Sequence, residues 1–479
     1  MVTGMSKGPE AVIEKLGFGL AQLRYLVLGH GVWFTESMQL AISAVFTVCL
    51  APQLGWSHSQ RALSQSLVFV GILCGSFIGG YVGDIIGRRP PILACYLVAT
   101  VAQLLHLCTT TYWIFAILRV CLGFAHGMGM PTSIALVSET SPVAYRALLM
   151  GIRNVLFGSG SIYAAIVIII DDASMKNLHW RIDLLTTVVP PAILLLLAWA
   201  FLYESPLILA RTGRQQEALK SLEAIRGLNG RDASTVDVSF SSDFTEAKVK
   251  DTGKKDSFKQ LKILFERKML FNTITLAWAS LSMNLLLYGH SYAFSIISTG
   301  QARGGSDVSG MLPGYQALIQ AVVGLLIILV IVPVGAVLSR KAMLCIGSIF
   351  GIGGMILFSL TGGLPERTPF QNGMYFLAQN TPSLSCGCAF LGIYQLAVDL
   401  YPVEAASTSA AFVILIGRIG SILAPFIFEA FAAWESFYNL LSITSAITLL
   451  MTLWVIRSPA PAEKLALAEK EADMESMPL

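Results

Sequence analysis

Twelve long apolar runs divide the chain, and short stretches rich in polar residues, glycine or proline separate them. A helix needs about 20 predominantly apolar residues to cross a hydrocarbon core about 30 Å thick. The pattern therefore predicts an all-α membrane protein with twelve transmembrane helices. We place the spans at 24–50, 61–82, 90–109, 113–138, 147–170, 182–203, 268–299, 312–337, 341–362, 373–400, 406–432 and 436–457.

The distribution of positive charge predicts how these spans are oriented. Residues 1–23 lack the apolar core and cleavage site of a signal peptide, so we expect the N-terminus to remain in the cytosol. Twelve spans then return the C-terminus to the cytosol. Under this topology the loop at 204–268 is cytosolic and holds thirteen Lys and Arg residues, whereas the loop at 171–181 is outside and holds two. This bias agrees with the positive-inside rule. A plasma membrane and an organelle or vesicle membrane both remain open.

Two stretches that lie 260 residues apart share a sequence pattern. ETSPVAYR at 139–146 is mirrored by DLYPVEAA at 399–406, and the same offset places GSI at 160–162 over GSI at 420–422. The repeat predicts two six-helix halves, at 1–203 and 268–457. A cytosolic linker with short helices joins them at 204–267, where QQEALKSLEAIRGL has high helix propensity, and a cytosolic tail follows at 458–479. Repeated halves are typical of transporters that bind solute between them.

Composition narrows the functional classes. The chain is 55% hydrophobic and 13% charged, whereas soluble domains carry roughly 25% charged residues. A net charge of +3 is too small to indicate a nucleic-acid partner. The eight cysteines show no metal-binding spacing, and we find no nucleophile elbow or phosphate loop. We therefore expect no enzymatic activity, metal or cofactor, and the expected partners are the lipid bilayer and a small organic solute.

Five motifs, taken in order, resemble those of a known family. They are GYVGDIIGRR at 80–89, RVCLGFAHGMG at 119–129, ETSPVAYR at 139–146, YESPLILARTGRQQEAL at 203–219, and DLYP at 399–402 with GRIGSILAP at 417–425. The chain resembles major facilitator superfamily transporters, and most closely the organic cation/anion transporter and synaptic-vesicle-2-related branch, with sugar-porter-like motifs. The resemblance implies the major facilitator fold, two pseudo-symmetric bundles, alternating access and a monomer.

Departures from the family pattern refine this expectation. Only about ten residues separate the first two spans, so the large cysteine-rich outer loop of animal organic ion transporters is missing. GCAFLGIYQL replaces the proline-rich tenth helix of sugar porters, and Gln395 stands where their tryptophan would be. Ala406 replaces the arginine expected in the second-half motif, and the aspartate of the second inter-helix loop is absent. Inner gating should therefore depend mostly on the first half.

The resemblance also implies a set of gating residues on the cytosolic face. Asp84, Arg88, Glu139, Arg146, Glu204 and Arg214 are expected to form ion pairs there, and Gly87 can adopt a tight turn. Exposed ion pairs contribute only about 0–1 kcal/mol each, which suits a gate that must open. Alternatively, the charges only satisfy the membrane topology. The full candidate gating set is Gly80, Asp84, Arg88, Arg89, Glu139, Arg146, Glu204, Arg214 and Asp399.

Polar residues inside the predicted spans are candidates for the solute site, because a charge at a helix centre costs about 2.5–3.5 kcal/mol and usually marks a pathway. By resemblance, Arg418 stands where organic anion transporters carry an arginine, and it could bind a carboxylate with two hydrogen bonds. Alternatively, it pairs with Glu36 or Glu429 and only locks helices. The full candidate substrate-binding set is Glu36, Gln39, Asn154, Asn284, Tyr288, Tyr394, Gln395 and Arg418.

Glu36 is the candidate for proton coupling or for contact with a cation, since burial favours the neutral form of a carboxyl group. Alternatively, it is a structural carboxylate paired with a neighbouring helix. Asn154 follows Arg146 by eight residues, where sugar porters place a sugar-binding glutamine. We interpret the buried histidines His30, His126 and His290, together with Arg119, as packing or hydrogen-bonding residues.

The leading hypothesis is a transporter of a small polar organic solute that works by alternating access. An organic anion or zwitterion is slightly favoured because Arg418 is present, an organic cation is close behind, and proton coupling through Glu36 is left open. Two alternatives remain: a transporter-like sensor or vesicle protein without net flux, and a sugar porter.

Overall fold

The computed structural model describes residues 8–232, 236–240, 257–302, 311–364 and 367–456. Within this part of the chain, twelve helices are long and apolar enough to span a membrane, and each starts and ends within a few residues of a predicted span. The prediction of twelve membrane helices is confirmed. They are α2 (Leu20–Gln53), α3 (His58–Ile86), α4 (Arg89–Leu107), α5 (Tyr112–Glu139), α6 (Val143–Asp172), α7 (Trp180–Phe201), α12 (Leu270–Ser298), α13 (Pro313–Val337), α14 (Arg340–Gly362), α15 (Pro369–Asp399), α16 (Val403–Ala430) and α17 (Trp434–Val455).

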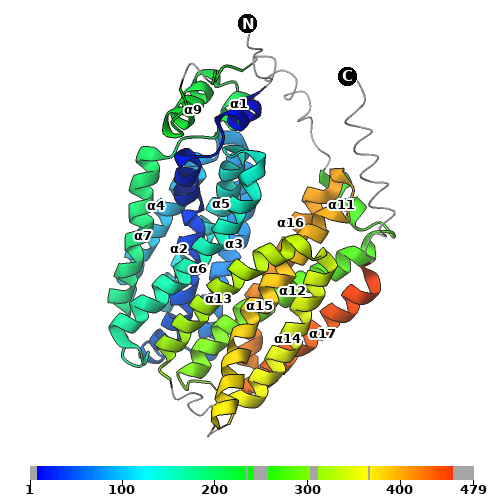
Figure 1. Cartoon of the computed structure of the whole chain (residues 1–479). Helices are drawn as coiled ribbons and strands as arrows, with labels where there is room; N and C mark the ends of the chain where they lie inside the picture. The colour runs from blue at the N-terminus through cyan, green and yellow to red at the C-terminus, as the bar shows by residue number, and fades with distance from the viewer. Residues whose placement is uncertain (1–7, 233–235, 241–256, 303–310, 365–366, 457–479) are drawn as a thin grey trace.

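The helices form two bundles, α2–α7 and α12–α17, as Figure 1 shows. We name the end of the molecule that carries α9 the α9 end, and the other end the far end. The ribbons of the two bundles diverge toward the α9 end and converge at the far end (Figure 1). The expected two-bundle architecture is therefore present in the fold.

The internal repeat found in the sequence corresponds to equivalent packing in the two bundles. The prolines that precede α6 and α16 have nearly the same backbone angles, with φ −58° and ψ 146° in one and φ −55° and ψ 147° in the other. A Cβ atom added at Gly160 would lie 2.2 Å from the carbonyl oxygen of Phe34, and one at Gly420 would lie 2.3 Å from that of Leu281. Each glycine therefore lets α6 or α16 approach the first helix of its own bundle closely.

Short helices cover the α9 end. They are α1 (Pro9–Leu16), α8 (Pro206–Arg211) and α9 (Gln215–Leu228) on the first bundle, and α11 (Ser257–Leu264) on the second. The bounds of α9 are those of the segment predicted as helical. Within the predicted linker the stretches at 233–235 and 241–256 lie outside the described residues, as does the predicted tail at 458–479.

Asn229, directly after α9, connects α9 to α2 through side-chain hydrogen bonds. Its side-chain oxygen accepts a hydrogen bond from the backbone N–H of Ala21 at 3.0 Å, and its side-chain nitrogen donates to Gln22 Oε1 at 3.0 Å. Further along the chain, Val238 and Phe240 are buried in the same apolar core as α2. The described parts of the middle loop up to Phe240, residues 204–232 and 236–240, therefore pack as part of the first bundle.

Candidate functional site

Arg88 binds two carboxylates at the α9 end. It lies between α3 and α4, where its Nη1 is 2.6 Å from Asp84 Oδ1 and its Nη2 is 2.9 Å from Glu139 Oε1. Burial alone would lower the pKa of Arg88, but the hydrogen bonds to Glu139 and Asp84 outweigh burial and raise it above the ordinary value. One buried guanidinium thus joins the end of α3 to the end of α5.

Among the described residues, Glu204 is bound by backbone groups rather than by a side-chain ion pair. Its carboxylate accepts hydrogen bonds from the N–H groups of Arg88 at 2.7 Å, Arg89 at 3.0 Å and Ser205 at 2.8 Å. Burial raises the pKa of Glu204, and these three N–H donors oppose the rise. Gly87 has φ +113°, and a Cβ atom there would lie 2.2 Å from a Glu204 oxygen. The α3–α4 turn is therefore folded around this carboxylate.

The other candidate gating residues make contacts within their own bundle. Arg146 donates to the carbonyl oxygen of Ser141 at 3.2 Å, and Arg89 donates to that of Trp199 at 2.7 Å. Arg214 binds its helical neighbour Glu217 through two hydrogen bonds of 2.8 and 2.5 Å.

The last two gating candidates, Asp399 and Gly80, are not part of the cluster around Arg88. Arg340 and Asp399 form an ion pair of 3.2 Å in the second bundle, and both side chains are about half exposed, at 47% and 51%. This pair is the second-half counterpart of Arg88 and Glu139, in a far more hydrated setting. A Cβ atom added at Gly80 would meet nothing within 4 Å, so no close helix contact depends on Gly80.

The second candidate group lies where the bundles face each other in the middle of the membrane helices. Glu36 on α2 is 1% exposed, and neither carboxylate oxygen has a hydrogen-bond partner among the described residues. The positively charged groups that interact with it electrostatically are Arg153 on α6 and Arg418 on α16. The guanidinium of Arg153 also stacks over Trp33 at 4.6 Å. Two arginines from different bundles thus interact electrostatically with one buried carboxylate.

Aromatic and amide side chains of the second bundle complete this central group. Arg418 donates to the hydroxyl oxygen of Tyr288 at 3.4 Å, and the Tyr288 ring packs against Phe69 of the first bundle with centroids 4.6 Å apart. Tyr394 interacts electrostatically with Arg418, and Asn284, on α12, donates a hydrogen bond to the carbonyl oxygen of Ser280 and accepts one from Ser421. The central group is therefore Glu36, Arg153, Asn284, Tyr288, Tyr394 and Arg418.

Three residues of the candidate substrate-binding set, Gln39, Asn154 and Gln395, are not members of the central group. Gln39 bonds Ser43 at 3.4 Å, and Ser43 in turn binds Arg119 inside the first bundle. Asn154 is partly buried and accepts a hydrogen bond from its neighbour Arg153 at 3.1 Å. Gln395 is exposed, one residue beyond Tyr394. The structure thus brings Asn154 to the edge of the central group, whereas Gln39 donates to Ser43 inside the first bundle.

Sequence reasoning missed a cluster at the far end. Glu429 on α16 binds Arg61 on α3, with Nη2 and Oε1 2.6 Å apart, and also accepts a hydrogen bond from the Tyr292 hydroxyl at 2.8 Å. His58 lies 3.0 Å from the other oxygen. Arg61 and Glu429 both fall inside predicted membrane spans. Two opposite charges inside spans were the feature of the sequence from which this pair could have been predicted. The suggested pairing of Arg418 with Glu429 is wrong, because Arg61 occupies that carboxylate.

Further hydrogen bonds between the bundles, in the part of the chain that the structure describes, also lie away from the α9 end. The Ser66 hydroxyl donates to the carbonyl oxygen of Ile422 at 2.7 Å. The backbone N–H of Gly314 donates to the carbonyl oxygen of Ala173 at 2.9 Å. Among the described residues, no cluster of three or more His, Cys, Asp or Glu side chains could hold a metal ion.

Comparison with known proteins identifies the family. A sequence model of the Major Facilitator Superfamily matches residues 31–425, which is more than four fifths of the chain. The chain belongs to the Major Facilitator Superfamily. The resemblance of the five motifs is therefore confirmed at the level of the superfamily.

Relatives of this superfamily member come from several branches. Organic cation/carnitine transporter 7 of Arabidopsis thaliana is 26% identical over 453 residues, covering 87% of each chain. Synaptic vesicle 2-related protein of Bos taurus is 29% identical over 228 residues, which is 46% of this chain and only 39% of the relative. Solute carrier family 22 member 6 of Danio rerio is 24% identical over 77% of this chain and 62% of its own.

Solved structures support the same fold. The inward-open xylose transporter XylE from E. coli matches 92% of this superfamily member and 97% of its own chain, with a TM-score of 0.68 and 15% identity. The partially occluded inward-open form of that protein gives a TM-score of 0.64 at 16% identity. At this identity the likeness establishes the major facilitator fold.

Proposed function

We propose that this superfamily member carries a small organic anion or zwitterion across a membrane. The observation that supports this choice is the central group, in which Arg153 and Arg418 interact electrostatically with one carboxylate, Glu36. Two guanidinium groups and one carboxylate leave one excess positive charge when all are ionised. A solute carboxylate would balance that charge and could accept two hydrogen bonds from Arg418. The hydroxyl groups of Tyr288 and Tyr394 offer further hydrogen bonds on the same side.

Solute uptake into proteoliposomes tests this proposal. We would compare an aromatic carboxylate (benzoate), a zwitterion (carnitine) and a cation (tetraethylammonium). We expect Arg418→Gln to reduce carboxylate uptake at least tenfold and Arg418→Lys to reduce it less, because lysine keeps the charge but loses the planar two-bond geometry. Arg181→Gln, an exposed arginine at the far end of α7, is the control. Uptake of tetraethylammonium alone would reject an anionic solute.

We further propose that the α9 end faces the cytosol and that the protein works by alternating access. In support, the hydrogen bonds and ion pairs described between the bundles lie in the far part of the molecule, where Arg61 and Glu429 join α3 to α16. The charges around Arg88 lie at the other end and are satisfied within the first bundle. Exchange between two arrangements would require the far-end contacts to break while contacts at the α9 end form.

Glu36 is our proposed proton-coupling residue, because it is buried and its oxygens lack hydrogen-bond donors in the described residues. Glu36→Gln keeps the shape of the side chain but cannot release a proton. We expect this variant to lose accumulation driven by a pH gradient and to keep exchange of labelled for unlabelled solute across the same vesicles. Loss of both activities in a correctly folded variant would instead make Glu36 a solute contact.

The same vesicles distinguish the two alternative functions. Ligand-induced thermal stabilisation without any uptake or exchange would support a transporter-like sensor. Uptake of xylose or glucose that Arg418→Gln leaves unchanged would support a sugar porter, the class to which the structurally similar XylE belongs.

A further inference from the structure

Glu36 lies close enough to Arg153 and Arg418 to interact with them electrostatically, yet it forms no ion pair in the described part of the chain. A buried carboxylate is costly unless it is paired, and a guanidinium group is well suited to pair with it. The contacts that hold each arginine away from Glu36 are therefore part of the design of the central group. For Arg418 the partner is the Tyr288 hydroxyl, at 3.4 Å.

Arg153 is held by the ring of Trp33. Its guanidinium carbon lies over this ring, 4.6 Å from the centroid. Tryptophan is the side chain whose ring attracts a cation most strongly, and the attraction acts within about 6 Å of the centroid. The Nη2 atom of Arg153 donates to Asn154 Oδ1 at 3.1 Å, whereas the buried Nε has no hydrogen-bond partner within the described residues. The stacking on Trp33 and the bond to Asn154 thus fix the guanidinium.

Trp33 is in turn fixed by α5. Its indole Nε1 donates to the Ser133 hydroxyl at 3.1 Å, and that hydroxyl donates to the carbonyl oxygen of Met130 at 2.8 Å. Ser133 is fully buried, so its hydroxyl has no water to bond instead. Trp33 and Glu36 are three residues apart on α2 and therefore occupy neighbouring positions on one face of the helix. The ring of Trp33 thus holds the Arg153 guanidinium near Glu36 without an ion pair between them.

This arrangement affects what a solute between the bundles can contact. Trp33, Arg153 and Arg418 are partly exposed, whereas Glu36 is 1% exposed. A solute would therefore reach the two arginines more readily than the carboxylate. An Arg153 paired with Glu36 would have its positive charge neutralised and its N–H groups occupied, and it would offer little to a second carboxylate.

We propose that Trp33 is a positioning residue whose ring prevents Arg153 from pairing with Glu36 and so keeps the guanidinium available for the carboxylate of the solute. The solute part of this role rests on the proposed transport of an organic anion or zwitterion. In a variant that lacks the ring, Arg153 closes an ion pair with Glu36. The solute then loses one of its two positively charged partners.

Thermal unfolding of the purified full chain in detergent tests the position of Arg153 without any solute. In the wild type, Glu36→Gln removes a buried carboxylate that has no partner, so we expect it to raise the unfolding temperature or leave it unchanged. In the Trp33→Leu background the same substitution removes the new partner of Arg153 and should lower the unfolding temperature. Trp33→Phe keeps a ring for the guanidinium and should behave like the wild type. Trp33→Met replaces Trp33→Leu if the latter does not fold. An effect of Glu36→Gln that is the same in the wild type and without the ring would overturn the proposal.

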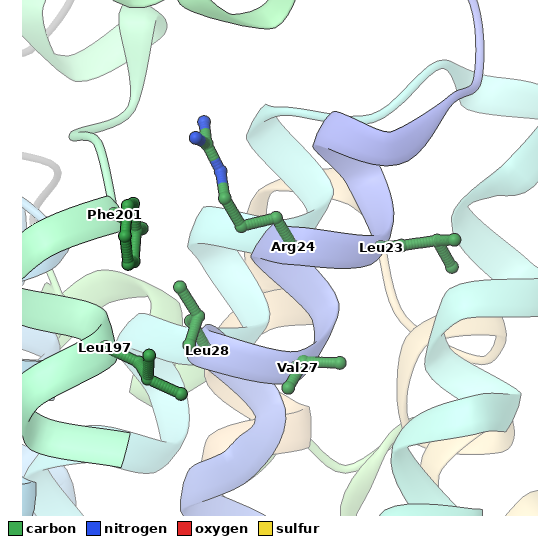
Figure 2. A pocket seen from close by; sticks show the side chains of 6 residues that line it. All are labelled: Leu23, Arg24, Val27, Leu28, Leu197 and Phe201. Carbon is green, nitrogen blue, oxygen red and sulfur yellow. The ribbon is translucent and has the colours of Figure 1, made fainter. Parts of the chain in front are cut away.

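A second arginine that stacks on a ring provides the matched control. Figure 2 shows Arg24 near the start of α2, with its guanidinium extending away from Leu28 and Leu197. The guanidinium carbon lies 4.9 Å from the centroid of the Tyr203 ring. Arg24 precedes Glu36 by about three helical turns, which is too far for an ion pair. Tyr203→Leu should therefore leave the effect of Glu36→Gln as it is in the wild type.

Binding of benzoate to the same variants separates this role from the proposed function. We expect Trp33→Leu to weaken binding at least tenfold, Trp33→Phe to weaken it less, and Trp33→Leu/Glu36→Gln to recover most of the affinity. A tryptophan that only packs would give no recovery, because changing Glu36 does not restore lost packing, and that result would overturn the proposal. A wild type that binds neither benzoate nor carnitine would reject the proposed solute class. The reversed effect of Glu36→Gln on unfolding would then still assign to Trp33 the separation of Arg153 from Glu36.

Discussion

At the scale of single residues, the membrane helices contain buried charges of two kinds: charges that form an ion pair, and a carboxylate whose oxygens have no hydrogen-bond donor among the described residues. Arg61 and Glu429 are 6% and 9% exposed and satisfy each other, with Tyr292 as a further donor. Glu36 is as deeply buried but has no hydrogen-bond donor in the described part of the chain. The first arrangement satisfies both charges within the protein, whereas in the second the carboxylate oxygens keep their full capacity to accept hydrogen bonds.

The Arg61–Glu429 pair gives a prediction for stability. Arg61→Leu leaves the Glu429 carboxylate buried without its guanidinium, which we expect to cost about 3 kcal/mol and to lower the thermal unfolding temperature in detergent. The double variant Arg61→Leu/Glu429→Leu removes both charges and should recover most of this loss. A double variant no more stable than Arg61→Leu would show that the contact does not behave as a coupled ion pair.

Residue-level pairing was the part of the molecule that the sequence predicted least well. Arg61 and Glu429 are separated by 368 positions, so no local pattern relates them. Glu204 was expected in an ion pair, yet its partners are mainly backbone N–H groups, which exist in every sequence and leave no residue-specific signal. Gln39 lies one helical turn from Glu36 and so on nearly the same face of α2, but its side chain donates a hydrogen bond to Ser43 inside the first bundle, a contact that sequence spacing does not predict.

At the scale of secondary structure elements, sequence was far more informative. Helix bounds followed from apolar length, because a span must cross a fixed thickness of hydrocarbon. The repeat at an offset of 260 residues also corresponded to a physical contact, since Gly160 and Gly420 each bring their helix against a backbone carbonyl of the first helix in their bundle. What the sequence could not provide was the packing of α1, α8 and α9 on the first bundle, because that depends on contacts such as those of Asn229.

The paired glycines predict equivalent effects in the two halves. Gly160→Ala and Gly420→Ala should each lower the thermal unfolding temperature, because the added Cβ would lie 2.2–2.3 Å from a carbonyl oxygen and force the helices apart. Gly353→Ala in α14 meets nothing within 4 Å and should leave stability unchanged or slightly raised. Thermal unfolding of all three variants in one detergent checks this, and a loss of stability in Gly353→Ala as large as that in Gly160→Ala and Gly420→Ala would contradict the close-packing argument.

At the scale of the whole molecule, the proposed orientation can be measured directly. His179 and Glu217 have exposed side chains at the far end and the α9 end, at 69% and 52%. In cells expressing a variant without native cysteines, we expect His179→Cys to react with a membrane-impermeant maleimide from outside. Glu217→Cys should react only after the membrane is permeabilised. The reverse pattern would invert the topology and place the Arg88 cluster outside.

The two bundles also differ in how their α9 ends are held. Arg88 is buried and bound to two carboxylates, whereas Arg340 and Asp399 are joined by one exposed contact. Exposed ion pairs are screened by salt much more than buried ones. The second bundle should therefore be the more easily deformed of the two at this end.

The burial of Phe240 in the core of the first bundle, and of Leu264 in that of the second, has a consequence for assembly. A chain divided between these residues would leave each fragment with all six of its membrane helices and with the short helices that cover its own α9 end. We expect that two such fragments, produced separately in one cell, associate through the contacts between α3 and α16 at the far end and form a heterodimer. Such a split protein would still hold Arg61 against Glu429 without any covalent connection between them.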